Sequence, residues 1–377
     1  MSKPARAVLA ACIGALAAAQ TAAAQPVPTP RLELVAEFPH QVTGVAVAPD
    51  GRTFVTFPRW TEDVPISVAE ITRTGQLRPF PDDGWNAWRN ARRDTVSPDD
   101  HWVCVQSVVA DQRGNLWVVD AGAPAMAAVV PGAPKLVRIS LAAGTVAQVI
   151  RFGPDVALQG SYLNDVRIAP DGRHAYLTDS GASGAIVVVD LASGAERRVL
   201  DGHPSTQPEP GVTVIADGHE LRRPDGRGAR FGADGIALSR DGRTLFWQAL
   251  TGRTLYRIAT EGLHRALLQP DQGPPLAPEP YGENGVADGL HIGRDSGMLY
   301  ITAPEENAVK LRDLSRPNTR PVTLIQDRRL RWPDSFAEAP DGSLYVTTSR
   351  IQDSAMFVPS SPLALPTQLW RLDFAGR

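Results

Sequence analysis

The sequence has little cysteine, few charged residues and no excess of either charge. Its 377 residues include 2 cysteines and 21% charged residues, with 38 Lys and Arg against 41 Asp and Glu. Without a clustered basic excess the chain cannot displace the counterions of nucleic acid, so we exclude that partner. Cys12 falls in a segment that we expect to be removed, which leaves Cys104 alone and excludes an internal disulfide. Stability must then come from a large core, which a chain of this length can supply.

Several motifs of known chemistry are also missing. The sequence contains no Gly-x-Ser-x-Gly elbow and no phosphate-binding loop, which disfavours serine-hydrolase and nucleotide chemistry. Its 7 histidines show no zinc spacing. No convincing amphipathic helix separates the strand-like segments. These absences favour an all-β chain whose chemistry depends on carboxylates and amides.

The first 24 residues have the organisation of a secretory signal peptide. Lys3 and Arg6 precede the uncharged residues 7–19, and small residues lead up to Ala24. We expect cleavage after Ala24 and a secreted or periplasmic mature protein, residues 25–377. The apolar run is shorter than the about 20 residues that span a bilayer, so we expect no stable membrane span.

Cys12 ends the tetrapeptide Leu-Ala-Ala-Cys, which has the form of a lipoprotein box. The apolar run before it is only about five residues, short for the apolar core of a signal peptide. The sequence therefore disfavours lipidation at Cys12 without settling it.

One pattern occurs six times along the chain. Each copy is a short apolar strand, a turn built on Asp-Gly or a relative, and a second apolar strand. Glycine suits the turn, because a tight hairpin needs a positive φ that costs little for a residue without Cβ. The turn glycines, separated by 63, 58, 70, 55 and 45 residues, are Gly51, Gly114, Gly172, Gly242, Gly297 and Gly342.

A second pair of strand-like segments follows most of these hairpins, for example residues 135–141 and 145–152. Six units of four antiparallel strands predict an all-β, six-bladed β-propeller in one domain, residues 25–377, in preference to two domains, a sandwich or a β-helix. The last unit has only three strands of its own, and residues 31–38 belong to no unit. We expect residues 31–38 to complete the sixth blade and close the ring, which removes an exposed edge.

A column of polar residues begins the first strand of each unit. The six positions lie eight residues before the turn glycine, or nine at the longer fifth turn, and are Thr43, Gln106, Asn164, Asp234, Asp288 and Asp334. The first strands of a propeller surround its axis, so these six residues, the polar ring, should meet at one mouth of the channel. The position directly after the ring residue also supplies the polar residues Asp165 and Ser335.

Carboxylates this close together repel one another unless they are solvated, protonated or neutralised by a cation. Calcium is the obvious cation, because it takes carboxylate, amide and water oxygens. We predict metal ligands at Asn164, Asp234, Asp288 and Asp334. We predict contacts with a small-molecule ligand at Gln106, Asp165 and Ser335. A structural alternative stays open, since Asp and Asn at strand starts often bond local backbone, and Asp-Gly is common in turns.

Other residues have simpler interpretations. We expect His291 to be a hydrogen-bonded core histidine and Cys104 to be a buried, inert thiol. The basic run 327–332 is typical of a solvated loop. Two long insertions, residues 81–101 and 202–231, could cover a mouth of the channel, although the tryptophans of the first could equally pack that loop down.

Three segments, residues 105–122, 162–205 and 231–258, together resemble the major royal jelly protein and insect yellow protein family. The resemblance implies a secreted six-bladed propeller that handles small aromatic or amine ligands, and some members are credited with dopachrome tautomerisation. Gln112 stands near where a family cysteine would pair with Cys104, so that family disulfide is absent here.

A more distant similarity is to the gluconolactonase and senescence-marker propellers. Their calcium-binding Asn and Asp match Asn164 and Asp234, while their first-blade Glu falls at about Thr43 or Gly44, so Asp288 or Asp334 would have to substitute. The similarity implies lactone hydrolysis in which calcium polarises the carbonyl and a carboxylate activates water.

We assign that catalytic role to Asp234 and Asp288. Two other hypotheses remain open: an isomerase of dopachrome-like compounds, and a non-catalytic binder of small aromatic or amine ligands.

Overall fold

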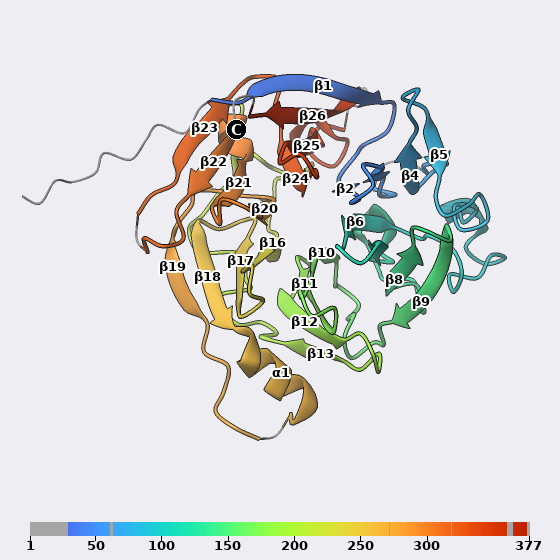
Figure 1. The fold of residues 1–377 in the computed structure, drawn as a ribbon, viewed down its shortest axis with the longest axis horizontal. Coiled ribbons are helices and arrows are strands. Elements are labelled where there is room, and N and C mark those ends of the chain that lie inside the picture. Colours follow the sequence, from blue (N-terminus) through green and yellow to red (C-terminus); the bar gives the residue numbers. More distant parts are fainter. Residues whose placement is uncertain (1–28, 61–62, 271, 318, 360–364, 375–377) are drawn as a thin grey trace, which may run out of the picture.

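The computed structural model describes residues 29–60, 63–270, 272–317, 319–359 and 365–374. These residues form a six-bladed propeller of four-stranded antiparallel sheets around a central axis (Figure 1), which confirms the predicted fold class. The expected signal peptide, residues 1–24 with Cys12, lies outside the described residues, so its cleavage stays a prediction. No helix in the described ranges is long and apolar enough to cross a membrane.

Blades 1 to 3 follow one another along the chain, and the strands of each pair in chain order. Blade 1 consists of β2 (Val45–Val47), β3 (Thr53–Thr56), β4 (Val68–Ile71) and β5 (Leu77–Pro79). Blade 2 consists of β6 (Val105–Ala110), β7 (Asn115–Asp120), β8 (Lys135–Ser140) and β9 (Thr145–Arg151). Blade 3 consists of β10 (Leu163–Ile168), β11 (His174–Asp179), β12 (Ala185–Asp190) and β13 (Glu196–Val199).

Blades 4 and 5 repeat this order. Blade 4 consists of β16 (Ala233–Leu238), β17 (Thr244–Ala249), β18 (Thr254–Ala259) and β19 (Glu279–Glu283). Blade 5 consists of β20 (Leu290–Ile292), β21 (Leu299–Ala303), β22 (Ala308–Arg312) and β23 (Val322–Gln326).

Blade 6 is built from both ends of the described chain. Its strands β24 (Pro333–Glu338), β25 (Leu344–Thr348) and β26 (Thr367–Asp373) are joined by β1 (Arg31–Phe38), as predicted. β1 runs antiparallel to β26, with Arg31 opposite Asp373 and Phe38 opposite Thr367. This pairing covers the edge that β26 would otherwise expose and joins the last blade to the first.

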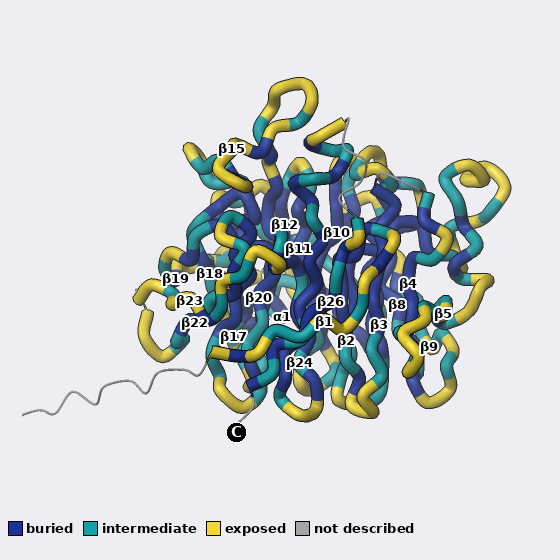
Figure 2. Tube along the Cα trace, turned by 90° about the horizontal axis from the view of Figure 1, so that it is seen from above, coloured by how far each residue is buried: buried dark blue, intermediate teal, exposed yellow. Residues whose placement is uncertain are grey.

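The core lies between the blades. The first strands contact one another in a closed circuit, β2–β6–β10–β16–β20–β24–β2. A separate apolar cluster fills each interface between neighbouring blades; the one between blades 2 and 3 includes Val119, Leu136, Leu163 and Leu177, all fully buried. Burying each such side chain contributes about 1.5–3 kcal/mol. Figure 2 shows the buried strands inside and the exposed turns and loops at both ends.

The six turn glycines all have positive φ, from 64° to 85°, as the hairpin pattern required. One helix departs from the expectation of an all-strand chain. The helix α1 (Thr260–Leu268) lies between β18 and β19 and packs Leu263, Ala266 and Leu267 against the interface of blades 3 and 4. Its nine residues give too short an apolar pattern for detection from the sequence.

The remaining short elements lie in the connections between strands. They are four 3-10 helices, η1 (Asn90–Arg92), η2 (Pro124–Met126), η3 (Pro304–Glu306) and η4 (Ile351–Asp353), and a small hairpin of β14 (Ile215–Ala216) and β15 (His219–Glu220). The hairpin stands at one end of the propeller, at the top of Figure 2.

Candidate functional site

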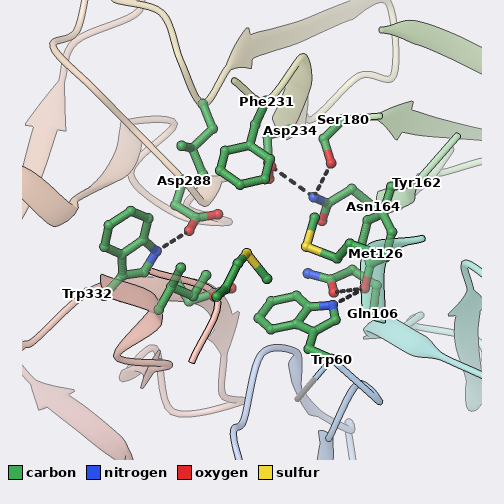
Figure 3. A pocket seen from close by; sticks show the side chains of 14 residues that line it. Trp60, Gln106, Met126, Tyr162, Asn164, Ser180, Phe231, Asp234, Asp288 and Trp332 are labelled. Carbon is green, nitrogen blue, oxygen red and sulfur yellow. Dashed lines mark hydrogen bonds between the residues drawn. The ribbon is translucent and has the colours of Figure 1, made fainter. Parts of the chain in front are cut away.

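A cavity lies at one mouth of the channel (Figure 3). Five of the six residues of the polar ring line it: Gln106, Asn164, Asp234, Asp288 and Asp334. The polar ring forms the base, and loops between strands supply apolar walls that include Trp60, Met126, Phe231, Trp332 and Met356. The predicted convergence of the column is therefore confirmed, although its sixth member, Thr43, does not line the cavity.

Irregular strand pairing surrounds the ring residues. In blades 2, 3, 4 and 6 the register of the first two strands shifts at the ring position, for example between Leu163 and Val166 around Asn164. In blades 1 and 5 the ladder begins only after the ring residue, at Val45 and Leu290. Bulges of this kind redirect side chains, so the strands can aim ring residues into the cavity.

Hydrogen bonds between blades hold the backbone of the ring. The hydroxyl of Thr43 donates to the carbonyl of Gln106 (2.7 Å), that of Ser107 to Asn164 (2.7 Å) and that of Thr178 to Asp234 (2.6 Å). These bonds connect blades 1 to 4 in sequence. A fourth bond, from Thr347 to the carbonyl of Thr43 (2.6 Å), connects blade 6 to blade 1.

Where blades 4, 5 and 6 meet, two glycines allow the neighbouring strands to approach closely. A Cβ at Gly235 would stand 2.1 Å from the carbonyl oxygen of Asp288, and one at Gly289 equally close to that of Asp334. The two Asp-Gly pairs are therefore packing requirements between blades. The turn chemistry considered as an alternative does not account for them.

The ring side chains bond one another and neighbouring polar groups. The Asn164 amide donates to Asp234 Oδ2 and to Ser180 Oγ, both at 2.9 Å. The Trp332 indole N–H donates to Asp288 Oδ2 at 2.7 Å (Figure 3). In the described ranges, no Lys, Arg or His forms an ion pair with Asp234, Asp288 or Asp334.

The three carboxyl groups are buried, with Asp234, Asp288 and Asp334 exposed by only 5%, 6% and 3%. Burial, followed by the charge of Asp288, raises the pKa of Asp234 and of Asp334 well above the ordinary value. Burial raises the pKa of Asp288 to about 7, against the opposing Trp332 hydrogen bond. A hydrogen bond between the carboxyl groups further raises the pKa of Asp234 and lowers that of Asp288. Near neutral pH Asp288 can therefore gain or lose a proton.

Two residues predicted to contact a ligand do not line the cavity. Ser335 donates its hydroxyl to Asp334 Oδ1 (2.9 Å), which orients that carboxylate. Asp165 lies 3.7 Å from the Arg167 guanidinium, which also donates to the carbonyl of Leu290 across in blade 5. Burial raises the pKa of Asp165, and Arg167 lowers it. Asp165 nevertheless lies near enough to the ring for its charge to raise the pKa of Asp234, Asp288 and Asp334.

The aromatic walls were missed by the sequence analysis. Tyr162, Phe231 and Trp332 line the cavity and stand two or three residues before a ring residue, a repeated signal that could have identified them. Trp332 belongs to the run interpreted as a solvated loop, yet it is fully buried. Its neighbour Arg331 forms ion pairs with Asp217 and Asp353. These ion pairs connect the basic run to two other loops of the chain.

Only one of the two long insertions reaches the cavity. Phe231 ends the insertion 202–231, and Val214 and Leu221 of the same insertion join the apolar cluster around the cavity. The insertion 81–101 packs down, with Trp88 buried under the Arg59 guanidinium (5.4 Å to the ring centroid).

Cys104 and His291 have the roles expected of them. Burial raises the pKa of the Cys104 thiol to about 12, which makes it inert. The ring nitrogen Nε2 of His291 lies 3.0 Å from Glu338 Oε2, a hydrogen-bonding distance.

The raised pKa of Asp288 predicts a pH-dependent stability. An acid with a higher pKa in the folded chain stabilises the fold most at low pH, and the contribution is lost as pH rises from about 4, the unfolded pKa, to about 7 and above. In a chelating buffer, we expect Asp288→Asn to raise the melting temperature relative to the parent increasingly between about pH 5 and pH 8. A pH-independent difference between the two melting temperatures would contradict the assignment.

The predicted metal site is not assembled in this structure. In the described part of the chain, no three His, Cys, Asp or Glu side chains stand close enough together to hold a metal ion. The ring nevertheless presents hard oxygen donors, carboxylates and an amide, of the kind that calcium takes.

Solved structures of other propellers share this fold. An alignment with a luciferin-regenerating enzyme covers 92% of this chain and 96% of that chain, with a TM-score of 0.55 and 11% sequence identity. An alignment with a gluconolactonase from Xanthomonas campestris covers 92% of this chain and 90% of that chain (TM-score 0.54, 13% identity). An alignment with a putative gluconolactonase covers 91% of this chain and 92% of that chain (TM-score 0.54, 13% identity). At these identities the likeness shows the fold alone.

A sequence comparison identifies the family. No curated protein matches the chain significantly. The model of the major royal jelly protein family matches residues 103–355, which run from the start of blade 2 to the connection between β25 and β26 in blade 6 and include five of the six ring residues. The chain therefore belongs to the major royal jelly protein family.

Proposed function

We propose that this propeller hydrolyses small lactones at the cavity, with a divalent cation, calcium first, in the polar ring. The observation that carries the proposal is the set of three buried carboxyl groups, Asp234, Asp288 and Asp334, beside the Asn164 amide and without a cationic partner among the described residues. The similarity of the fold to gluconolactonases supports it.

The residues that would hold the cation are Asn164, Asp234, Asp288 and Asp334. Their oxygens match the preference of calcium, and a positive charge among them would relieve the repulsion that raises their pKa values. Because these side chains do not stand close enough in this structure, they would have to converge when the ion binds. Bound there, the cation would supply Lewis-acid polarisation of a carbonyl.

The acid-base steps fall to one residue of the chain, Asp288. Deprotonated Asp288, oriented by the Trp332 N–H, accepts a proton from a water molecule as the water oxygen bonds to the carbonyl carbon. When the ring C–O bond breaks, Asp288 returns this proton to the leaving oxygen, while Asp234 stays a carboxylate that would hold the cation. The overall reaction adds one water and opens the lactone to a hydroxy acid. Apolar walls such as Phe231 and Met126 hold the rest of the substrate and exclude bulk water.

The aromatic walls favour a second candidate, an isomerase of a dopachrome-like compound. Trp60, Tyr162, Phe231 and Trp332 offer flat surfaces to an aromatic or quinonoid ring. The same Asp288 would remove a proton from carbon, and Asp234 would return one elsewhere on the ring. Turnover of such quinones above the spontaneous rate in the parent, lost in Asp288→Asn, would favour this candidate over hydrolysis.

Cation binding is tested by titrating chelator-stripped protein with calcium. A cation that binds only the folded chain stabilises it by about 2.7 kcal/mol at a hundredfold excess over its dissociation constant, so we expect the melting temperature to rise with calcium. Asp334→Asn should abolish most of the rise, whereas the matched control Asp295→Asn, in an exposed turn, should keep it. An unchanged melting temperature, with no ion bound in calorimetry, would refute the calcium site.

We also propose that the protein acts outside the cell or in the periplasm, on the strength of the signal-like segment before Gln25. A mature N-terminus at Gln25 in protein recovered from outside the cytoplasm would support this location. Full-length protein retained inside the cell would contradict it.

A further inference from the structure

The wall of the cavity opposite the carboxyl groups holds a chain of three polar side chains. The Trp60 indole N–H donates to the Tyr162 hydroxyl, and the Tyr162 hydroxyl lies 2.9 Å from Gln106 Oε1. All three side chains line the cavity (Figure 3). They come from blades 1, 2 and 3, whereas Asp234, Asp288 and Asp334 come from blades 4, 5 and 6.

The direction of these hydrogen bonds follows from their chemistry. An indole N–H can only donate, so the Tyr162 oxygen accepts from Trp60 and its own proton is free for another acceptor. The Gln106 amide oxygen at 2.9 Å is a far better acceptor than the Cys104 sulfur at 3.8 Å. The amide oxygen of Gln106 must therefore face Tyr162, which determines the orientation of an amide that is otherwise ambiguous.

The same bonds leave the amide nitrogen of Gln106 unused. No group in the described ranges accepts a hydrogen bond from Nε2, and Figure 3 shows this nitrogen directed into the cavity. The backbone of Gln106 cannot shift easily, because its carbonyl accepts bonds from the Thr43 and Thr56 hydroxyls at 2.7 and 2.9 Å. A preorganised donor thus faces the three carboxyl groups across the cavity.

We infer that Gln106 Nε2 binds a neutral carbonyl oxygen of the ligand, with Tyr162 and Trp60 as positioning residues. A carboxylate ligand would also fit this donor, but no Lys, Arg or His among the described residues lines the cavity to neutralise it, so the preferred class is neutral carbonyl compounds: lactones, lactams and ketones. This inference rests on the proposed function only in taking the cavity as the ligand site.

The test uses two bicyclic probes that differ in one carbonyl group. 4-Chromanone carries a ketone and cannot be hydrolysed, and chroman lacks the ketone. We expect the parent protein to bind chromanone about tenfold more tightly than chroman in calorimetry, the size of one good hydrogen bond. Gln106→Leu and Gln106→Glu should both remove this preference while chroman binding stays the same.

A positioning role for Tyr162 makes a separate prediction. Tyr162→Phe keeps the ring but releases the Gln106 amide, so the preference for chromanone should fall to about threefold or less. The matched control Tyr256→Phe, which alters a tyrosine outside the cavity lining, should keep the parental preference. A folded Tyr162→Phe variant therefore tests the inference even if changes at Gln106 impair folding.

Three results would overturn the inference: equal affinity of the parent for both probes, a preference that survives in Gln106→Leu, or no binding of chromanone at millimolar concentration. Failure of the proposed hydrolysis is distinguishable from these results. A protein that prefers chromanone but does not open lactones retains the Gln106 site and loses only the proposed reaction.

Discussion

Replacing Asp288 with Asn is expected to reduce kcat/KM for lactone hydrolysis by about 10²–10⁴-fold without unfolding the protein. The amide keeps the size of the side chain and can still accept the Trp332 hydrogen bond, but it cannot take a proton from water. The measurement is proton release from a panel of γ- and δ-lactones. Asp295→Asn, which changes the same side chain in an exposed turn, serves as the control.

The pH profile of the same reaction separates a base from a structural carboxylate. Activity of the parent should rise with increasing pH, because Asp288 acts only when deprotonated, and a bound cation should place the midpoint below the pKa of about 7 that burial gives Asp288. The Trp332 hydrogen bond lowers the pKa of Asp288, so Trp332→Phe should move this inflection to higher pH. An Asp288→Asn variant with activity within about twofold of the parent would exclude Asp288 as the base.

Replacing Asp120 with Ala is expected to lower the free energy of unfolding by about 3–5 kcal/mol, the largest single effect on stability that we predict. Asp120 is fully buried and accepts hydrogen bonds from the backbone N–H of Val103 (2.7 Å) and Cys104 (2.8 Å) and from the Lys135 ammonium (3.0 Å). Its loss leaves a buried ammonium without a counter-charge, together with unpaired backbone donors. Urea unfolding, followed by circular dichroism, measures the change.

Replacing Lys135 tests whether the buried, unpaired ammonium is the reason for the expected loss of stability in Asp120→Ala. Lys135→Met removes the buried charge, and Asp120 keeps its bonds to backbone donors, so this variant should lose distinctly less stability than Asp120→Ala. Burial lowers the pKa of Lys135 and the charge of Asp120 raises it, which shows the direction of the coupling. If both variants lost the same free energy of unfolding, the loss would come from breaking the ion pair and not from leaving the Lys135 ammonium buried without a counter-charge.

Much of the fold could be predicted from local patterns. Each Asp-Gly or related turn lies between apolar strands, and such a hairpin is specified by residues close in sequence. The same is true of the pair Lys135–Ser140 and Thr145–Arg151, which form β8 and β9 near the expected limits. The helix α1 was missed because its packing partner is the interface of blades 3 and 4, which no local pattern reveals.

The site could be predicted only in part. The equivalent positions of Gln106, Asn164, Asp234, Asp288 and Asp334 follow from the repeat, since the repeat itself implies a ring. Asp165 and Ser335 were predicted to contact a ligand, yet neither lines the cavity, because the direction of a side chain at a bulge depends on the neighbouring blade, which the sequence does not show. Trp332 was assigned to solvent because its burial depends on loops from distant parts of the chain.

The sequence by itself determined the six repeated hairpins, the propeller they build, the closure of the ring by Arg31–Phe38, and the column of polar residues around the axis. These features depend on spacing and on alternation over a few residues. Only the tertiary structure decided which side chains share the cavity, how burial raises the pKa values of Asp234 and Asp288, and which way the Gln106 amide faces. Those properties arise from burial and from contacts between blades, where groups far apart in the chain meet in a medium that penalises unpaired charge.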